Sequence, residues 1–202
     1  MISRPQRPLC IVISSPSGGG KTTLCGRLLR EFPSMVYSIS CTTRAPRPGE
    51  VEGENYYFLA EPEFQRRVKA GDFIEYAQVH AHWYGTPKQR IEKALNEGRD
   101  ALLAIDVQGA ERIRTLISGP VSDILKTALV DIFVVPPSIN VLQQRLDGRG
   151  QDTEETIALR LANAEKEMAC RDRYKYVIVN DRLDDAFERL KVIIEAEHRR
   201  VV

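Results

Sequence analysis

The sequence lacks the cysteine patterns of a metal centre or a disulfide framework. It has four cysteines in 202 residues, none of them in a C-x-x-C pair, and no set of cysteines and histidines has the spacing of zinc ligands. The four are Cys10, Cys25, Cys41 and Cys170. We therefore expect four reduced thiols, as is typical of cytoplasmic proteins.

Long hydrophobic runs and an excess of one charge are also absent. No apolar run approaches the roughly 20 residues that cross a bilayer, and residues 1–8 lack the apolar region of a signal peptide. The formal net charge is +1, whereas nonspecific nucleic-acid binders usually carry a strong basic excess. With 43% hydrophobic and 28% charged residues, the composition is that of a soluble globular domain. We expect a cytoplasmic protein with no membrane or nucleic-acid partner.

Short apolar runs alternate with helical patterns along the chain. The runs predict buried strands at Leu9–Ser14, Ala101–Ile105, Ile132–Val135 and Tyr176–Val179. The helical patterns that follow them run from Leu24 to Phe32 and over Gln108–Ile117, Ser138–Leu146 and Asp184–Glu197. Such alternation is typical of an α/β fold, in which helices cover both faces of a parallel sheet.

Two segments interrupt this alternation. Residues 35–86 contain aromatic and turn residues with short alternating runs, which predict a small antiparallel lobe. Residues 147–172 are highly charged and contain a long helix, which Asp152 or Thr153 would cap, with Glu155 as the capping-box partner of Asp152. This second segment predicts a mobile lid. Because no repeat or linker is present, we expect one domain with two insertions.

A glycine-rich segment lies between the first predicted strand and its helix. It reads Ser15-Pro16-Ser17-Gly18-Gly19-Gly20-Lys21-Thr22 and matches G-x-x-x-x-G-K-[ST] except at its first position. Glycines let backbone N–H groups turn toward phosphate oxygens, lysine reaches the β- and γ-phosphates, and threonine offers a hydroxyl to Mg²⁺. A plain glycine turn with a solvated lysine is the alternative, but the flanking strand and helix favour a phosphate loop. Ser15 costs about 1 kcal/mol only if its φ is positive.

A second segment, residues 40–50, is dense in groups that bind phosphate. Arg44 and Arg47 are held by neighbouring prolines, and arginine forks match phosphate oxygens. Ser40, Tyr56 and Tyr84 add hydroxyl donors. The alternative is that these are ordinary surface arginines. For a single arginine, this alternative would be the better interpretation.

These residues, together with motifs farther along the chain, resemble the guanylate kinase family from about residue 9 to about residue 197. The further motifs are Gly53-x-x-Tyr56, Phe73-Ile74-Glu75, Tyr84-Gly85-Thr86, Ile105-Asp106-x-Gln108-Gly109, Pro136-Pro137-Ser138, Gly148-Arg149-Gly150 and Ile178-Val179-Asn180-Asp181. The resemblance implies a P-loop three-layer α/β fold with a central parallel sheet, an inserted small mixed α/β GMP-binding lobe and a helical lid. It implies one domain over residues 1–202, with the core at about 1–34, 87–140 and 173–202, the lobe at about 35–86 and the lid at about 141–172.

The same resemblance implies an enzyme that converts ATP and GMP to ADP and GDP by direct in-line phosphoryl transfer, in guanine nucleotide metabolism and recycling. It implies Mg²⁺ with ATP, ATP and GMP as the bound partners, and a monomer or homodimer. The implied catalytic residues are Lys21, Arg44, Arg149 and Arg160. The implied ATP-binding residues are Ser15, Pro16, Ser17, Gly18, Gly19, Gly20, Lys21, Thr22, Thr23, Arg145 and Asn180, with Thr22 also on Mg²⁺. The implied GMP-binding residues are Ser40, Arg44, Arg47, Tyr56, Glu75, Tyr84, Thr86 and Asp106.

Two of these residues have a chemistry that suits guanine. One carboxylate, that of Glu75, can accept hydrogen bonds from both N1–H and the exocyclic amino group of guanine, whereas adenine presents a bare acceptor at N1. Thr86 has an alternative role, because Thr86-Pro87-Lys88-Gln89 also resembles a helix start with threonine as N-cap. One hydroxyl can serve both roles.

One position departs from the family pattern. Relatives commonly carry Asp-x-Asp before Gln-Gly, whereas this chain has Ala104-Ile105-Asp106. If that first carboxylate helps to hold Mg²⁺ or a bound water, Asp106 or solvent must compensate for its absence here. Two alternatives to an active GMP kinase also stay open. One is a catalytically inactive module of the same fold that binds a partner protein, and the other keeps the enzyme but changes the acceptor to a related small phosphate.

Overall fold

The computed structural model describes residues 7–79, 81–119, 123–148 and 153–200. Within these residues, the chain forms one sheet of five strands and a second sheet of four. All four cysteines lie in the described segments and are free thiols, as predicted. No helix of the described segments is long and apolar enough to cross a membrane.

The five-stranded sheet is parallel throughout and has the order β2-β7-β1-β8-β9. Its strands are β1 Cys10–Ser14, β2 Val36–Tyr37, β7 Ala101–Ala104, β8 Leu129–Val135 and β9 Tyr176–Val179. The four strands predicted from apolar runs are confirmed. Strand β2 was not predicted, because two residues are too few to show a pattern, and it places Val36 and Tyr37 in the core sheet rather than in the lobe.

Helices cover both faces of this sheet, which confirms the predicted three-layer α/β fold. Helices α1 (Lys21–Glu31) and α8 (Leu183–Arg199) pack on one face, and the other is covered by α3 (Lys88–Asn96), α4 (Val107–Ile117) and α5 (Asp123–Ala128). Strand β1 divides its side chains between the two cores. Ile11 and Ile13 face α1 and α8, whereas Cys10 and Val12 face the opposite layer.

The inserted lobe is a mixed sheet with the order β4-β3-β6-β5 and one helix. Its elements are β3 Cys41–Thr42, β4 Tyr57–Phe58, α2 Glu61–Ala70, β5 Phe73–Val79 and β6 His82–Pro87. The expectation of an antiparallel lobe is therefore wrong in one respect, since β3 and β4 pair in parallel. Residues 43–56 form a loop without helix that joins β3 to β4. This loop returns the chain to the start of the sheet, so the two strands run in the same direction. Phe64 of α2 stacks on Phe73 at 4.7 Å between ring centroids and anchors the helix to the sheet.

Two helices form the segment predicted as a lid, α6 (Ile139–Asp147) and α7 (Glu154–Met168), followed by the short 3₁₀ helix η1 (Arg171–Arg173). Leu142 and Leu146 of α6 pack with Ala164 of α7 in a small core of their own. Thr153 is the N-cap of α7 and accepts a hydrogen bond from the backbone N–H of Thr156. The alternative cap, Asp152, lies outside the described residues.

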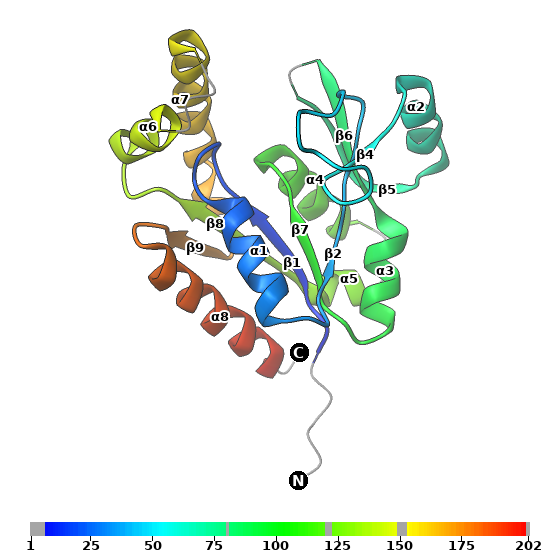
Figure 1. Cartoon of the computed structure of the whole chain (residues 1–202). Helices are drawn as coiled ribbons and strands as arrows, with labels where there is room; N and C mark the ends of the chain where they lie inside the picture. The colour runs from blue at the N-terminus through cyan, green and yellow to red at the C-terminus, as the bar shows by residue number, and fades with distance from the viewer. Residues whose placement is uncertain (1–6, 80, 120–122, 149–152, 201–202) are drawn as a thin grey trace.

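The lobe and the α6–α7 pair stand at the same end of the core, on either side of the loop after β1 (Figure 1). Both ends of the described chain lie toward the opposite end of the core (Figure 1). Since the core strands are parallel, the loops that follow β1, β7 and β9 all emerge at the edge between lobe and lid. That edge is where open parallel sheets bind their ligands.

Candidate active site

The glycine-rich loop joins β1 to α1, as predicted. Gly18 and Gly20 have φ of +91° and +99°, values that favour glycine. Ser15 has no such strain, because the only non-glycine residue with positive φ in the described segments is Ala81. The Ser15 hydroxyl donates a hydrogen bond to the carbonyl of Pro16 at 3.1 Å. The serine that departs from the motif therefore carries no backbone penalty.

Lys21 is the first residue of α1, and its side chain returns to the core. Its Nζ donates a hydrogen bond to the carbonyl of Ile105 at 2.9 Å, just beyond the end of β7. Burial lowers the pKa of Lys21, while the negative charges near it, Asp106 and Glu167 among them, oppose that shift. The ammonium is thus held at the mouth of the loop by a neutral partner, which leaves it able to bind phosphate.

A cleft of about 460 Å³ lies between this loop and the lobe. The loop side contributes Ser15, Pro16, Ser17, Gly18, Gly20, Lys21, Thr22 and Thr23 to its lining. The lobe contributes Ser40, Arg47, Tyr56, Glu75, Ala77, Val79 and Tyr84, and the core and α7 contribute Ala104, Ile105, Asp106 and Glu167. Most of the residues predicted for the two nucleotides therefore share one cavity.

Other predicted residues lie just behind that lining or outside the described residues. Arg44 and Thr86 donate hydrogen bonds to the cleft residues Tyr84 and Glu75. Asn180 donates to the carbonyl of Gly19 in the loop, and Arg145 donates in turn to the carbonyl of Asn180. Arg160 lies half-buried on α7, and it is not among the described residues that line the cleft. Arg149 lies outside the described residues, so its predicted role stays a prediction.

Glu75 and Thr86 form a buried pair on neighbouring strands of the lobe. Glu75 is 6% exposed, and its Oε1 accepts a hydrogen bond of 2.5 Å from the hydroxyl of Thr86. Burial raises the pKa of Glu75 to about 7. The predicted capping role of Thr86 is not what the structure shows, because α3 begins at Lys88 with Pro87 as N-cap and no side-chain cap bond.

The carboxylate of Glu75 also lies against the core. A Cβ atom added to Gly109 of α4 would come within 2.9 Å of Glu75 Oε2. Only a residue without a side chain leaves room for this carboxylate beside the helix. Gly109 belongs to the Ile105-Asp106-x-Gln108-Gly109 motif, but the motif does not predict its proximity to Glu75, because the two residues are far apart in the sequence.

The Arg44 side chain of the second phosphate segment is already paired with other groups. Arg44 donates to both oxygens of Glu50, at 2.8 and 3.0 Å, and to the hydroxyl of Tyr84 at 3.3 Å. Glu50 also accepts from the backbone N–H of Arg47 at 2.7 Å. The hydrogen bonds from Arg44 hold the pKa of Glu50 below its usual value. Glu50 is thus paired with the arginine that the resemblance assigns to a substrate phosphate.

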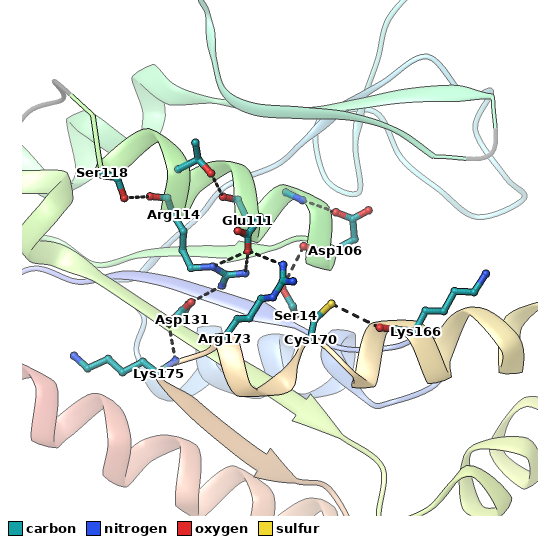
Figure 2. A network of polar contacts seen from close by, with 12 residues as sticks. Ser14, Asp106, Glu111, Arg114, Ser118, Asp131, Lys166, Cys170, Arg173 and Lys175 are labelled. Atoms are coloured by element: carbon teal, nitrogen blue, oxygen red, sulfur yellow. Dashed lines mark hydrogen bonds and ion pairs between the residues drawn. The ribbon is translucent and has the colours of Figure 1, made fainter.

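Asp106 begins α4 at the floor of the cleft. Its Oδ1 accepts from the N–H of Gly109 at 2.8 Å as the N-cap, and its carbonyl accepts from the hydroxyl of Ser14 at 3.3 Å. Figure 2 shows these bonds at one end of a polar network. Farther along α4, Arg114 binds the buried Asp131 of β8 at 2.6 Å. The network fixes the helix that presents Asp106.

Glu167 near the end of α7 is a cleft residue that sequence reasoning missed. It lines the same cavity as Lys21 and Asp106. Burial raises its pKa to about 7, with a further contribution from Asp106 and an opposing one from Lys21. No motif surrounds Glu167, so only the fold could bring this carboxylate to the cleft that Ala104 also lines.

The hydroxyl of Thr22 and the carboxylate of Asp106 are oxygen donors of the kind that Mg²⁺ prefers. Both line the cavity beside Lys21. The described residues contain no group of three or more histidines, cysteines or carboxylates arranged to hold a metal ion. Mg²⁺ that arrives with a nucleotide keeps several waters and needs only one or two protein ligands, so this small oxygen set fits it.

Comparison with known proteins agrees with the family resemblance seen in the sequence. A family model described as guanylate kinase matches residues 7–197. The chain is 48% identical to a guanylate kinase of Cereibacter sphaeroides, over 96% of this chain and 89% of that protein. It is 45% identical to a guanylate kinase of Rhizobium meliloti, over 96% and 85% of the two chains. The crystal structure of a guanylate kinase from Anaplasma phagocytophilum superposes with a TM-score of 0.77 at 32% identity, covering 98% of this chain and 89% of that one.

Proposed function

Since this chain belongs to the guanylate kinase family, we propose that the cleft between the phosphate loop and the lobe binds ATP and GMP with their phosphates facing each other. The enzyme transfers a phosphoryl group from ATP to GMP and forms ADP and GDP in guanine nucleotide metabolism. The observation that carries the proposed arrangement is the cavity of about 460 Å³, which Lys21 and Glu75 both line.

The loop Ser15–Thr22 binds the phosphates of ATP. Its support is geometric, because two glycines of positive φ shape a loop at the beginning of α1, where backbone N–H groups and the helix dipole favour an anion. Lys21 contacts the β- and γ-phosphates, and Thr23, Arg145 and Asn180 belong to the same half of the site. Mg²⁺ bound with ATP would be held by the Thr22 hydroxyl, with Asp106 as a carboxylate of the same cleft, and would reduce the negative charge of the phosphates.

The lobe binds GMP. Ser40, Arg47, Tyr56 and Tyr84 line the cavity and supply donors for its phosphate, with Arg44 behind them. Glu75 accepts from N1–H and the amino group of guanine, while Thr86 orients that carboxylate through its hydrogen bond. Asp106 faces GMP from the core side of the same cavity.

The Arg44–Glu50 pair must open for Arg44 to reach a phosphate. A side chain that exchanges a carboxylate for a phosphate keeps a charge-assisted hydrogen bond. The exchange of partners therefore costs little. Arg47 and the two tyrosines hold the phosphate first, so occupation of the acceptor site depends on them.

Transfer takes place in line between the two phosphates. The protein contributes positioning and charge neutralisation rather than covalent chemistry. Lys21 acts from the donor side and Arg44 from the acceptor side. Arg149 and Arg160 act from the lid, which closes over the cleft and excludes water. The lid comprises residues 141–172, and the enzyme works in the cytoplasm as a monomer or homodimer.

A coupled assay of ADP release tests this assignment. The purified protein is given Mg·ATP and each of GMP, AMP, CMP and UMP, with Lys21→Ala as the inactive control. We expect GMP to stimulate ADP release far more than the other three nucleotides. Equal stimulation by AMP, or GMP-dependent release that survives in Lys21→Ala, would contradict the assignment of the cleft.

A further inference from the structure

We propose that Asn180 is a positioning residue that orients a backbone N–H of the phosphate loop, and that Arg145 of α6 holds Asn180 in place. The inference rests on the proposed function of the loop as the triphosphate site. It gives Asn180 a role different from contact with the adenine or ribose of ATP.

Asn180 directly follows β9 and lies behind the phosphate loop. It is 4% exposed, and its Nδ2 donates a hydrogen bond of 2.8 Å to the carbonyl of Gly19. The identity of the side-chain atom follows from its partner, since a backbone carbonyl only accepts and the atom that faces it must be a donor. The backbone N–H of Asn180 donates to Val135 at 2.8 Å, which fixes the residue to the sheet.

The bond to Gly19 sets the direction of the next peptide N–H. In a planar trans peptide, the carbonyl of one residue and the N–H of the next point to opposite sides, and the described chain has no cis peptide. Because the Gly19 carbonyl is held toward Asn180, the N–H of Gly20 points away from it. Gly20 lines the cleft, so this N–H is offered to the side where phosphate binds.

The loop and Asn180 also fit each other closely. A Cβ atom added to Gly20 would lie 2.2 Å from Asn180 Nδ2, independently of the strain that its φ of +99° would cause. The other polar atom, Asn180 Oδ1, is buried and has no hydrogen-bond partner. The bond to Gly19 is therefore the one hydrogen bond through which this side chain acts on its surroundings in the described structure.

Arg145 connects this arrangement to α6. It donates to the carbonyl of Asn180 at 2.9 Å and to the carbonyl of Asp181 at 3.2 Å. Leu142 and Leu146 of the same helix face the loop, because a Cβ atom on Gly18 would come within 2.8 and 3.2 Å of their side chains. Helix α6 thus contacts the loop through apolar packing and through the chain Arg145–Asn180–Gly19.

Binding of inorganic tripolyphosphate separates positioning from base contact, because this probe has no adenine or ribose. Isothermal titration calorimetry compares ATP, tripolyphosphate and GMP for the wild type, Asn180→Ala and Asn180→Asp. Asn96→Ala, at the exposed end of α3, is the control for loss of an asparagine. We expect Asn180→Ala to weaken ATP and tripolyphosphate by the same factor, about tenfold, without changing GMP binding. Asn180→Asp should weaken both more, because its carboxylate faces the Gly19 carbonyl.

Retained GMP affinity shows in the same sample that each variant is folded, a result that a general loss of structure would not give. If Asn180→Ala is insoluble, Asn180→Ser removes the reach of the amide with less loss of packing and has the same expected result. A loss for ATP with unchanged tripolyphosphate binding would overturn the inference in favour of base contact, and so would unchanged binding of both. If the wild type binds no tripolyphosphate, or Lys21→Ala binds it equally well, the proposed function of the loop fails first.

Discussion

The two halves of the cleft present different kinds of groups, backbone in one half and side chains in the other. The phosphate loop is mainly backbone, shaped by Gly18 and Gly20 and held from behind by the neutral contacts of Lys21 and Asn180. The lobe is mainly side chains, and these are already bonded to one another as the pairs Arg44–Glu50 and Thr86–Glu75.

This difference indicates how each half receives its nucleotide. The loop presents donors that need no new partner exchange, so it is preorganised for a triphosphate. The lobe must exchange internal bonds for bonds to GMP, so its selectivity depends on which side chain gives up which partner. Substitutions in the loop should therefore affect the ATP half, and substitutions around Glu75 should affect the GMP half alone.

The largest effect is expected from Lys21→Ala. Removing a charge that stabilises the transferring phosphate should lower kcat by at least about 10²- to 10³-fold, while GMP binding is unchanged. Steady-state kinetics and GMP calorimetry measure the two quantities. Lys126→Ala, an exposed lysine on α5, is the matched control. A parallel loss of GMP affinity would show that the two halves are not independent.

The next effect concerns stability and pH. The pKa of Glu75 is raised from 4.5 to about 7 in the folded protein, so the folded state binds this proton more tightly than the unfolded state. Stability from this group is therefore greatest below about pH 4.5, falls as pH rises toward about 7, and does not recover above it. Glu75→Gln removes the penalty and should stabilise the free protein at about pH 8, by up to about 3 kcal/mol.

Denaturant unfolding across this pH range measures the effect. Glu167→Gln is a useful comparison, because Glu167 has a pKa of about 7 in the same window but is only half-buried. A stability difference between wild type and Glu75→Gln that is constant with pH would contradict the raised pKa.

A smaller effect is expected from Thr86→Val, which removes the hydrogen bond to Glu75 while keeping the shape of the side chain. We expect GMP kcat/KM to fall by roughly 10- to 30-fold, since a buried carboxylate loses its internal donor, with KM for ATP unchanged. Thr86→Ser should restore most of the activity because it keeps the hydroxyl. Equal activity of the valine and serine variants would separate Thr86 from guanine recognition.

The smallest effect is expected from Gly109→Ala. The new methyl group would lie only 2.9 Å from Glu75 Oε2 and would displace the carboxylate. We expect KM for GMP to rise several-fold, equivalent to about 1 kcal/mol. Gly26→Ala in α1 is the matched control, since a Cβ atom there meets no other atom within 4 Å. Identical kinetics of the two variants would mean that Glu75 adjusts freely.

Much of the fold and of the cleft could be predicted because the signals are local. The strand runs, the glycine loop and the positions of Lys21 and Glu75 depend on short patterns with a physical reason. Strand β2 was missed because two residues show no period, and the parallel pairing of β3 with β4 depends on the path of the intervening loop. Glu167 and Gly109 needed the tertiary structure, since their partners are distant in sequence.

Calorimetry of Glu75→Gln at about pH 8, where the wild-type carboxylate is ionised, tests the separation of the two halves most directly. Wild type and variant are each titrated with GMP and, separately, with ATP. The predicted result is a loss of GMP affinity of about 100-fold or more, with ATP affinity unchanged within about twofold. Unchanged GMP binding, or an equal loss for both nucleotides, would contradict the account.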